Sequence, residues 1–167
     1  MNLINNFLFS FFPYLAVFIF IFGSVYRYLN IQHSYSSLSS QFLEKKMLFF
    51  SSIPFHFGIL VMILFHLCAF IFPDFVINFL RTPEKLIFFE TLGLIFGISV
   101  FFGIFFFLIR RFNNKRLQMV TTKLDVVIEL VLLIQIFLGC LIAIEFRWGS
   151  IWFASSLSPY LWSLINF

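Results

Sequence analysis

Four long runs of apolar residues constrain this chain more than any other feature of its sequence. The clearest run lies between Met47 and Pro73 and contains no Asp, Glu, Lys or Arg. The other three extend over about 7–26, 86–109 and 126–144. A helix needs about 20 residues to cross a bilayer, and strands do not run unbroken for such a length. The sequence therefore predicts an all-α integral membrane protein with four transmembrane helices in a bundle, forming a single domain.

The composition excludes a water-soluble domain. Of the 167 residues, 62% are hydrophobic and 11% are charged, whereas soluble domains carry about 25% charged residues. So few charges cannot cover a surface that faces water. The two cysteines, Cys68 and Cys140, lie inside apolar runs and have no CxxC spacing. An iron–sulfur cluster bound by this chain is therefore not expected.

The distribution of basic residues predicts the orientation of the helices. Eight of them flank one side of the membrane: Arg27, Lys45, Lys46, Arg110, Arg111, Lys115, Arg116 and Lys123. Three flank the other side: Arg81, Lys85 and Arg147. Loops rich in Lys and Arg stay in the cytoplasm, so we expect a multi-pass protein of the cell (inner) membrane with its N-terminus outside. The net charge of +4 follows from this asymmetry and requires no nucleic acid as a partner.

Two further segments are assigned from their polarity. The first apolar run is not expected to be a cleaved signal peptide, because no basic residue precedes Arg27. The tail 148–167 is expected to be an interfacial stretch outside the membrane. Aromatic side chains that favour the headgroup level recur along it: Trp148, Trp152, Tyr160 and Trp162.

Two histidines, His56 and His66, stand in the uncharged second run. An ionisable side chain inside a membrane helix is costly and marks a functional site. Ten residues of helix separate the two by about 15 Å along the axis and by about 80° around it. Imidazole is an axial ligand of haem iron, and this spacing suits two haems stacked across the membrane. Hydrogen bonds to neighbouring helices are the alternative. His33 lies in a polar loop and is assigned no role.

Four stretches together resemble the gamma subunit of respiratory nitrate reductase along nearly the whole chain. They are FPYLAVFIFIFGSVYRY at 12–28, SSQFLEKK at 39–46, FHFGILVMILFH at 55–66, and RRF…VTTKLD from Arg110 to Asp125. The third stretch has the histidine spacing of the family, with Gly58 just after the first histidine. The four stretches occur in the order of the family and on the predicted helices and loops.

The resemblance implies five transmembrane helices that hold two b-type haems, each with two histidine ligands. Quinol is oxidised near the outer haem, and electrons pass to an iron–sulfur beta subunit and a molybdenum alpha subunit that reduces nitrate. It implies that His56 ligates the inner haem iron and His66 the outer one. Arg111 matches an arginine that pairs with a haem propionate, and Lys85 a lysine of the quinol site beside His66. The alternatives are topological anchoring for Arg111 and a lysine at the membrane interface for Lys85.

Two departures from the family bear on this expectation. The other pair of haem histidines lies on a fifth helix, and the sequence reaches Phe167 before that helix would begin. His56 and His66 are therefore expected to supply half of the haem ligands. Phe65 stands where a family member has Gly, and its ring is expected to narrow the quinol pocket. A haem-free membrane anchor, or a remnant of the subunit, is the alternative function. A small transporter is a weaker third candidate, because paired intramembrane charges and repeats are lacking.

Overall fold

The computed structural model describes residues 3–30 and 46–166. The chain divides into two compact units, Met1–Ser39 and Ser40–Phe167, which are described separately. His33, Lys45 and Phe167 lie outside the described residues, and so does the stretch SSQFLEKK at 39–46 apart from its last position.

The first unit is one unbroken helix from Leu3 to Asn30. It consists of α1 (Leu3–Asn6), a π-helical turn η1 (Phe7–Phe11) and α2 (Phe12–Asn30). None of its described side chains is buried within the unit. Such an apolar surface is stable where lipid or another apolar helix covers it. The helix expected over 7–26 is confirmed, and it is longer at both ends.

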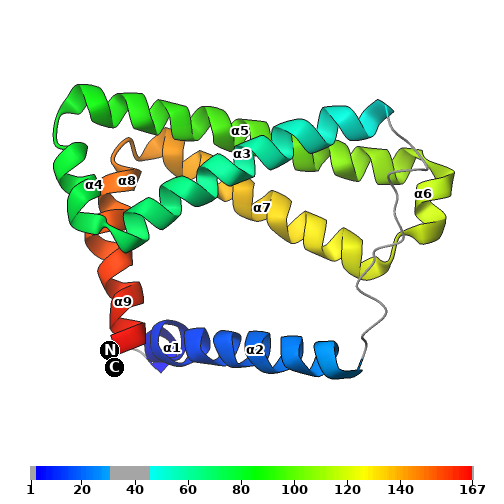
Figure 1. Ribbon diagram of the computed structural model, residues 1–167, viewed down its shortest axis with the longest axis horizontal. Helices are drawn as coiled ribbons and strands as arrows, with labels where there is room; N and C mark the ends of the chain where they lie inside the picture. Colours follow the sequence, from blue (N-terminus) through cyan, green and yellow to red (C-terminus); the bar gives the residue numbers. More distant parts are fainter. Residues whose placement is uncertain (1–2, 31–45, 167) are drawn as a thin grey trace. The chain divides into compact units, whose positions relative to one another are not determined.

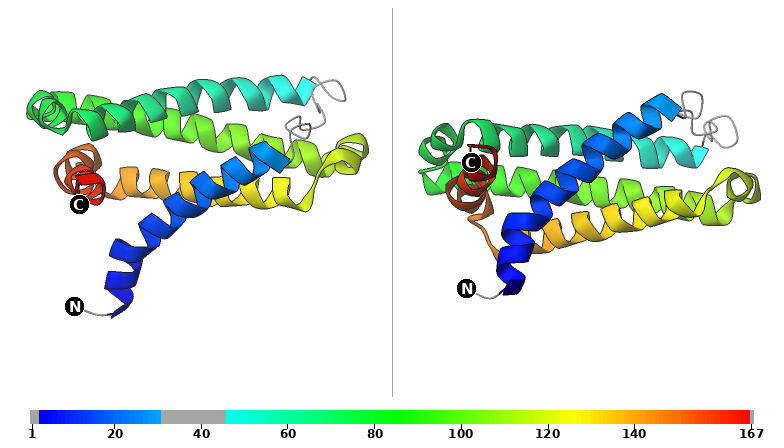
Figure 2. Two further views of the ribbon diagram at one scale, coloured as in Figure 1. Left: turned by 60° about the horizontal axis from the view of Figure 1, so that its bottom comes forward. Right: turned by 90° about the horizontal axis from the view of Figure 1, so that it is seen from below.

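Three long helices lie side by side in the second unit, as Figure 1 and Figure 2 show. They are α3 (Lys46–Ile71), α5 (Pro83–Asn113) and α7 (Lys123–Glu145). Two short helices join them, α4 (Pro73–Phe79) between α3 and α5, and α6 (Lys115–Val120) between α5 and α7. The central helix, α5, packs against both α3 and α7. Helices are thus found at all three expected places. Those expected over 86–109 and 126–144 are longer at both ends, whereas the one expected over 47–73 begins at Lys46 and ends at Ile71, and Pro73 already belongs to α4.

The two ends of this unit are named after the orientation expected from the sequence. The inner end contains the start of α3, the end of α5, α6 and the start of α7. The outer end contains α4, the start of α5 and the end of α7. Which end faces the cytoplasm stays a prediction.

Local chemistry fixes where these helices begin. Pro73 and Pro83 occupy the first turns of α4 and α5, where a missing N–H costs nothing. Thr122 and Asp125 form a capping box at the start of α7. The Asp125 amide donates to the Thr122 hydroxyl at 3.2 Å, and the Thr122 amide donates to the Asp125 carboxylate at 2.9 Å. These bonds satisfy amides that a helix start leaves unpaired.

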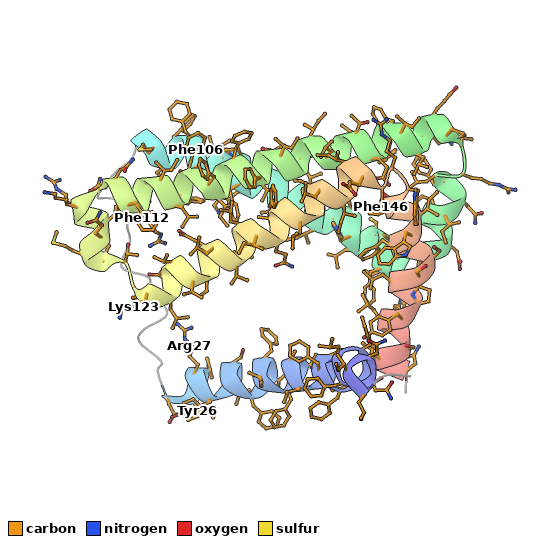
Figure 3. All side chains as sticks on the ribbon, turned by 180° about the vertical axis from the view of Figure 1, so that it is seen from behind. Tyr26, Arg27, Phe106, Phe112, Lys123 and Phe146 are labelled. Carbon is orange, nitrogen blue, oxygen red and sulfur yellow. The ribbon has the colours of Figure 1, made fainter. Side chains whose placement is uncertain are left out.

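Few side chains are buried, and most apolar ones project outwards. The buried apolar residues are Ala69, Leu80, Val100, Ile104, Leu108, Leu117 and Ala154. Large apolar side chains are exposed on the helices, as at Phe106 and Phe112, and just after α7, at Phe146 (Figure 3). Four helices of the described chain are long and apolar enough to cross a membrane. The structure therefore confirms an all-helical chain with four candidate membrane spans.

Two glycines allow α3 and α5 to approach closely. A Cβ added at Gly103 would lie 2.7 Å from the amide nitrogen of Phe55, and one added at Gly58 would lie 2.6 Å from a methyl carbon of Val100. The Ser99 hydroxyl also donates to the Pro54 carbonyl at 3.2 Å. Small residues and hydroxyl bonds of this kind are typical of helix contacts in membranes. They fix the part of α3 that carries His56.

Residues 149–166, expected to be an interfacial tail, are helical throughout. They comprise α8 (Gly149–Trp152), a π-helical turn η3 (Phe153–Leu157) and α9 (Ser158–Asn166). This segment, named helix 149–166 below, runs crosswise over the outer end of the long helices (Figure 1, Figure 2). A crosswise course is compatible with a position at the membrane surface, which stays a prediction.

Candidate functional site

Both candidate histidines lie on α3, one toward each end. The helix continues unbroken through Pro54, so His56 and His66 keep the helical spacing expected from the sequence. Both side chains are exposed within the described structure.

Each imidazole is held by the carbonyl one turn earlier in its own helix. Nδ1 of His56 lies 2.8 Å from the Ser52 carbonyl oxygen, and Nδ1 of His66 lies 2.7 Å from that of Met62. A carbonyl oxygen only accepts, so Nδ1 is the donor in both rings. In a neutral ring, Nε2 then carries the lone pair. Histidines that bind metals commonly donate their other nitrogen in this way.

Neither histidine bonds to another helix within residues 3–30 and 46–166. The Ser52 hydroxyl, 3.1 Å from Nδ1 of His56, is also one turn away on α3. The alternative of two histidines bonded to neighbouring helices thus finds no support in the described part of the chain. Nε2 of each ring makes no hydrogen bond there.

A pocket at the inner end brings His56 and Arg111 together. It has a volume of about 250 Å³ between α3, α5 and α7. Its lining combines apolar side chains with one histidine, two arginines and one glutamate: Leu48, Phe55, His56, Ile104, Phe107, Arg110, Arg111, Glu129 and Leu132. Polar groups gathered in a mostly apolar pocket are what a cofactor site requires.

Arg111 of α5 contacts α7 and the link between α6 and α7 at this pocket. Its Nε donates to Glu129 Oε1 of α7 at 2.6 Å, and its Nη1 donates to the Thr121 hydroxyl at 3.2 Å. The same Nη1 lies 3.8 Å from Asp125 Oδ2. The second oxygen of Glu129, Oε2, is buried and has no hydrogen-bond partner among the residues that the structure describes. Arg111 is thus an ion-pair centre whose positive charge also borders the pocket.

Arg110 and Glu129 are pocket residues that sequence reasoning missed. Arg110 is 3% exposed and lines the pocket together with His56. In the sequence, Arg110 is visible only as the neighbour of Arg111 at the end of an apolar run. Its place in the pocket depends on how the helices pack. Glu129 was visible as a carboxylate near the start of an apolar run, but its pairing with Arg111 depends on how α5 and α7 pack.

At the outer end, Lys85 and His66 are not brought into direct contact in the described structure. Lys85 Nζ lies 4.9 Å from the centre of the Phe79 ring. Phe79 contacts Phe89 at 5.4 Å between ring centres, and Phe89 contacts Phe65 at 6.0 Å. A series of rings therefore links Lys85 to the residue before His66. The Phe65 ring packs toward α5, and whether it narrows a quinol pocket stays a prediction.

A second pocket of about 230 Å³ lies between α5 and α7 at the outer end. Its lining does not include Lys85 or His66. The lining residues are Ile87, Glu90, Thr91, Leu94, Ala143, Ile144 and Arg147.

The donor set of the described residues fits a haem better than a metal ion held by protein alone. Within residues 3–30 and 46–166, no three His, Cys, Asp or Glu side chains gather where they could hold a metal ion. A haem brings four nitrogen ligands of its own and takes one histidine per face. Single imidazoles with Nε2 available, as at His56 and His66, suit that requirement.

Comparison with known proteins decides the family. The sequence profile described as "Nitrate reductase gamma subunit" matches residues 5–167. The chain belongs to the nitrate reductase gamma subunit family. It is 34% identical over 137 residues to the respiratory nitrate reductase 2 gamma chain of Escherichia coli K12, covering 81% of this chain and 61% of that protein. It is 32% identical over 129 residues to the nitrate reductase gamma chain of Bacillus subtilis 168, covering 76% of this chain and 58% of that protein.

A third relative, the respiratory nitrate reductase 1 gamma chain of E. coli K12, is 31% identical over 144 residues. That match covers 84% of this chain and 63% of the relative. The chain thus spans about three fifths of the length of the gamma chains that it matches. The resemblance read from the four sequence stretches is confirmed at the level of the family.

Proposed function

We propose that this chain is the haem-binding membrane subunit through which a respiratory nitrate reductase oxidises quinol. The observation that carries the proposal is the state of the two imidazoles. Both donate through Nδ1 to a carbonyl of their own helix, which leaves Nε2 as the ligating atom at two depths of one apolar span.

Particular residues would hold the two haems. His56 would supply one axial nitrogen to the inner haem iron and His66 one to the outer haem iron. Arg111 and Arg110 line the pocket of His56, where their charge suits a haem propionate. A bound haem supplies one-electron transfer. The chain's own groups orient it and keep water away.

The proposed partners follow from the family. An iron–sulfur beta subunit and a molybdenum alpha subunit of nitrate reductase would receive the electrons at the inner end, and nitrate would be reduced there, not on this chain. Quinol would be oxidised near His66 and Lys85 at the outer end, with the N-terminus outside the cell (inner) membrane. Lipid would cover the apolar helix surfaces.

The composition of the isolated complex tests this proposal. The full gene product is purified together with the other nitrate reductase subunits of its source, and reduced-minus-oxidised visible spectra are recorded. The proposal predicts two b-type haems per gamma chain and electron transfer from quinol to nitrate. An intact complex without haem in the membrane subunit would contradict the proposal and support the membrane anchor.

Lys85→Ala is expected to lower electron transfer from quinol about tenfold. A hydrogen bond from a charged donor contributes about 1.5–3 kcal/mol, which is tenfold or more in affinity. The measurement is the quinol-dependent rate of nitrate reduction, alongside haem reduction by dithionite, which should not change. Arg81→Ala is the matched control, since Arg81 is an exposed cation of the same outer end. Equal rates in the two variants would show that Lys85 has no special role.

A further inference from the structure

Helix 149–166 is fastened over the outer end at two points. At its start, the Ser150 amide donates to Glu90 Oε1 of α5 at 2.7 Å. Further along, the Ser158 hydroxyl and the Trp162 indole nitrogen both donate to the Phe70 carbonyl of α3, at 3.0 and 2.9 Å. These bonds tie the helix to both α3 and α5.

The Phe70 carbonyl is available because α3 ends there. Phe72 leaves helical geometry with φ −124° and ψ 59°, so the helical pairing of the Phe70 carbonyl with residue 74 is not formed. The last carbonyls of a helix need partners from outside the helix. Ser158 and Trp162 supply two donors, and the indole ring also stacks on the Phe70 ring at 5.2 Å between centres. This double contact is a specific docking point.

Between the two fastenings, the helix places Phe153 against His66. The two ring centres are 5.3 Å apart, and the planes are nearly perpendicular at 87°. Phe153 begins the π-helical turn η3, and both Ala154 and Ser158 are fully buried. A π turn takes in more residues than an α turn, which keeps residues 154 and 158 on the face that packs inward. π turns are frequent at functional sites.

The two histidines differ in what surrounds their rings. The ring neighbour of His56 is Phe55, the preceding residue of the same helix, at 5.3 Å. The ring neighbour of His66 is Phe153, from a helix far along the chain. The bond from Nδ1 to the i−4 carbonyl fixes the tautomer of both rings. Rotation about the last torsion of histidine is intrinsically broad, and Phe153 adds a contact from outside α3 that restricts the ring plane of His66.

We propose that Phe153 is a positioning residue for His66, and that helix 149–166 is the clamp that keeps it in place. This inference rests on the proposed function, in which His66 ligates the outer haem. The clamp restricts the plane of the His66 ring, so its loss would affect the outer haem site and not the inner one. The inner site does not depend on it, because the ring contact and hydrogen bonds of His56 come from α3 itself.

Phe153→Leu in the complete complex tests the inference. An aromatic pair of this geometry corresponds to about a 2- to 10-fold change in an equilibrium constant. We expect outer-haem occupancy to fall by about that factor, together with a shift of its electron paramagnetic resonance signal. The inner-haem signal should not change. Phe153→Tyr keeps the ring and should resemble the wild type. Phe137→Leu, which removes a ring whose contact is with Phe101 of α5, is the matched control.

Weakening the fastening should give the same signature. Ser158→Ala combined with Trp162→Phe removes both donors to the Phe70 carbonyl but retains an aromatic ring at 162. An unchanged outer-haem signal in Phe153→Leu, or equal loss of both haems, would overturn the inference. Retention of both haems by His66→Ala would instead overturn the proposed function, so the two failures are distinguishable.

Discussion

Gly103→Ala is expected to lower the amount of folded protein in the membrane several-fold. It is also expected to weaken haem binding at the proposed inner site more than at the outer one. The new Cβ would lie between 2.7 and 2.8 Å from N, Cα and Cβ of Phe55. These are mostly backbone atoms, so relief requires α3 and α5 to separate. Overpacking of this kind costs about 1–3 kcal/mol. Phe55 immediately precedes His56, so any such separation also displaces the imidazole that we propose as the inner haem ligand.

Gly93→Ala is the matched control, because Gly93 is on the same helix and a Cβ there would meet nothing within 4 Å. Alanine is also the better helix former, by about 1 kcal/mol. Gly93→Ala should therefore be at least as stable as the wild type. The measurement is the amount of protein in the membrane and its thermal aggregation midpoint in detergent. Equal amounts of protein and equal aggregation midpoints for Gly103→Ala and Gly93→Ala would contradict the close contact between α3 and α5 at Gly103.

Arg111→Ala is expected to destabilise the inner end strongly. The substitution removes the cation that pairs with Glu129 at 2.6 Å and lies 3.8 Å from Asp125. Glu129 is largely buried, and its Oε2 already has no hydrogen-bond partner within 3–30 and 46–166. Removing one member of a buried ion pair costs about 3–5 kcal/mol, because the remaining charge stays without compensation. Arg111 is 25% exposed as a side chain, so we expect a value near the lower limit, about 3 kcal/mol.

Two further variants test whether the destabilisation comes from an uncompensated charge at Glu129 or from the loss of any arginine at this end. Arg111→Leu combined with Glu129→Leu removes both partners and should recover most of the stability, because no uncompensated charge remains at Glu129. Arg116→Ala, at an exposed cation of the same end, should have little effect. Unfolding in detergent gives the comparison. A double variant as unstable as Arg111→Ala would argue against the ion pair as the cause.

The long helices could be predicted from the sequence, whereas the short ones could not. The four spans follow from the length of their apolar runs. Inside a bilayer every backbone N–H and C=O must be hydrogen-bonded within the protein, and a single apolar run of this length achieves this only as a helix. The structure extends three of the spans at both ends, whereas α3 ends at Ile71, two residues before the expected end at Pro73. Helices α4 and α6 have 7 and 6 residues, too few for periodicity to be recognised. Helix 149–166 depends on docking to Phe70 and Glu90, which lie far from it in sequence.

The candidate site shows a similar division. His56 and His66 could be found because an ionisable residue is conspicuous in an apolar helix. The hydrogen bonds of their Nδ1 atoms depend on side-chain rotamers and became visible only in the structure. Arg110, Glu129 and Phe153 could not be assigned, because their positions beside a histidine depend on the packing of α5, α7 and helix 149–166 around α3.

Single replacement of each histidine tests the central claim most directly. His56→Ala and His66→Ala are made in the full gene product, purified with the other nitrate reductase subunits, and compared by potentiometric titration of the haem absorption. Each variant is predicted to lose one haem and keep the other, and the two are predicted to lose different haems. Two haems with unchanged potentials in either variant would contradict the account, because the replaced imidazole would then not be a ligand.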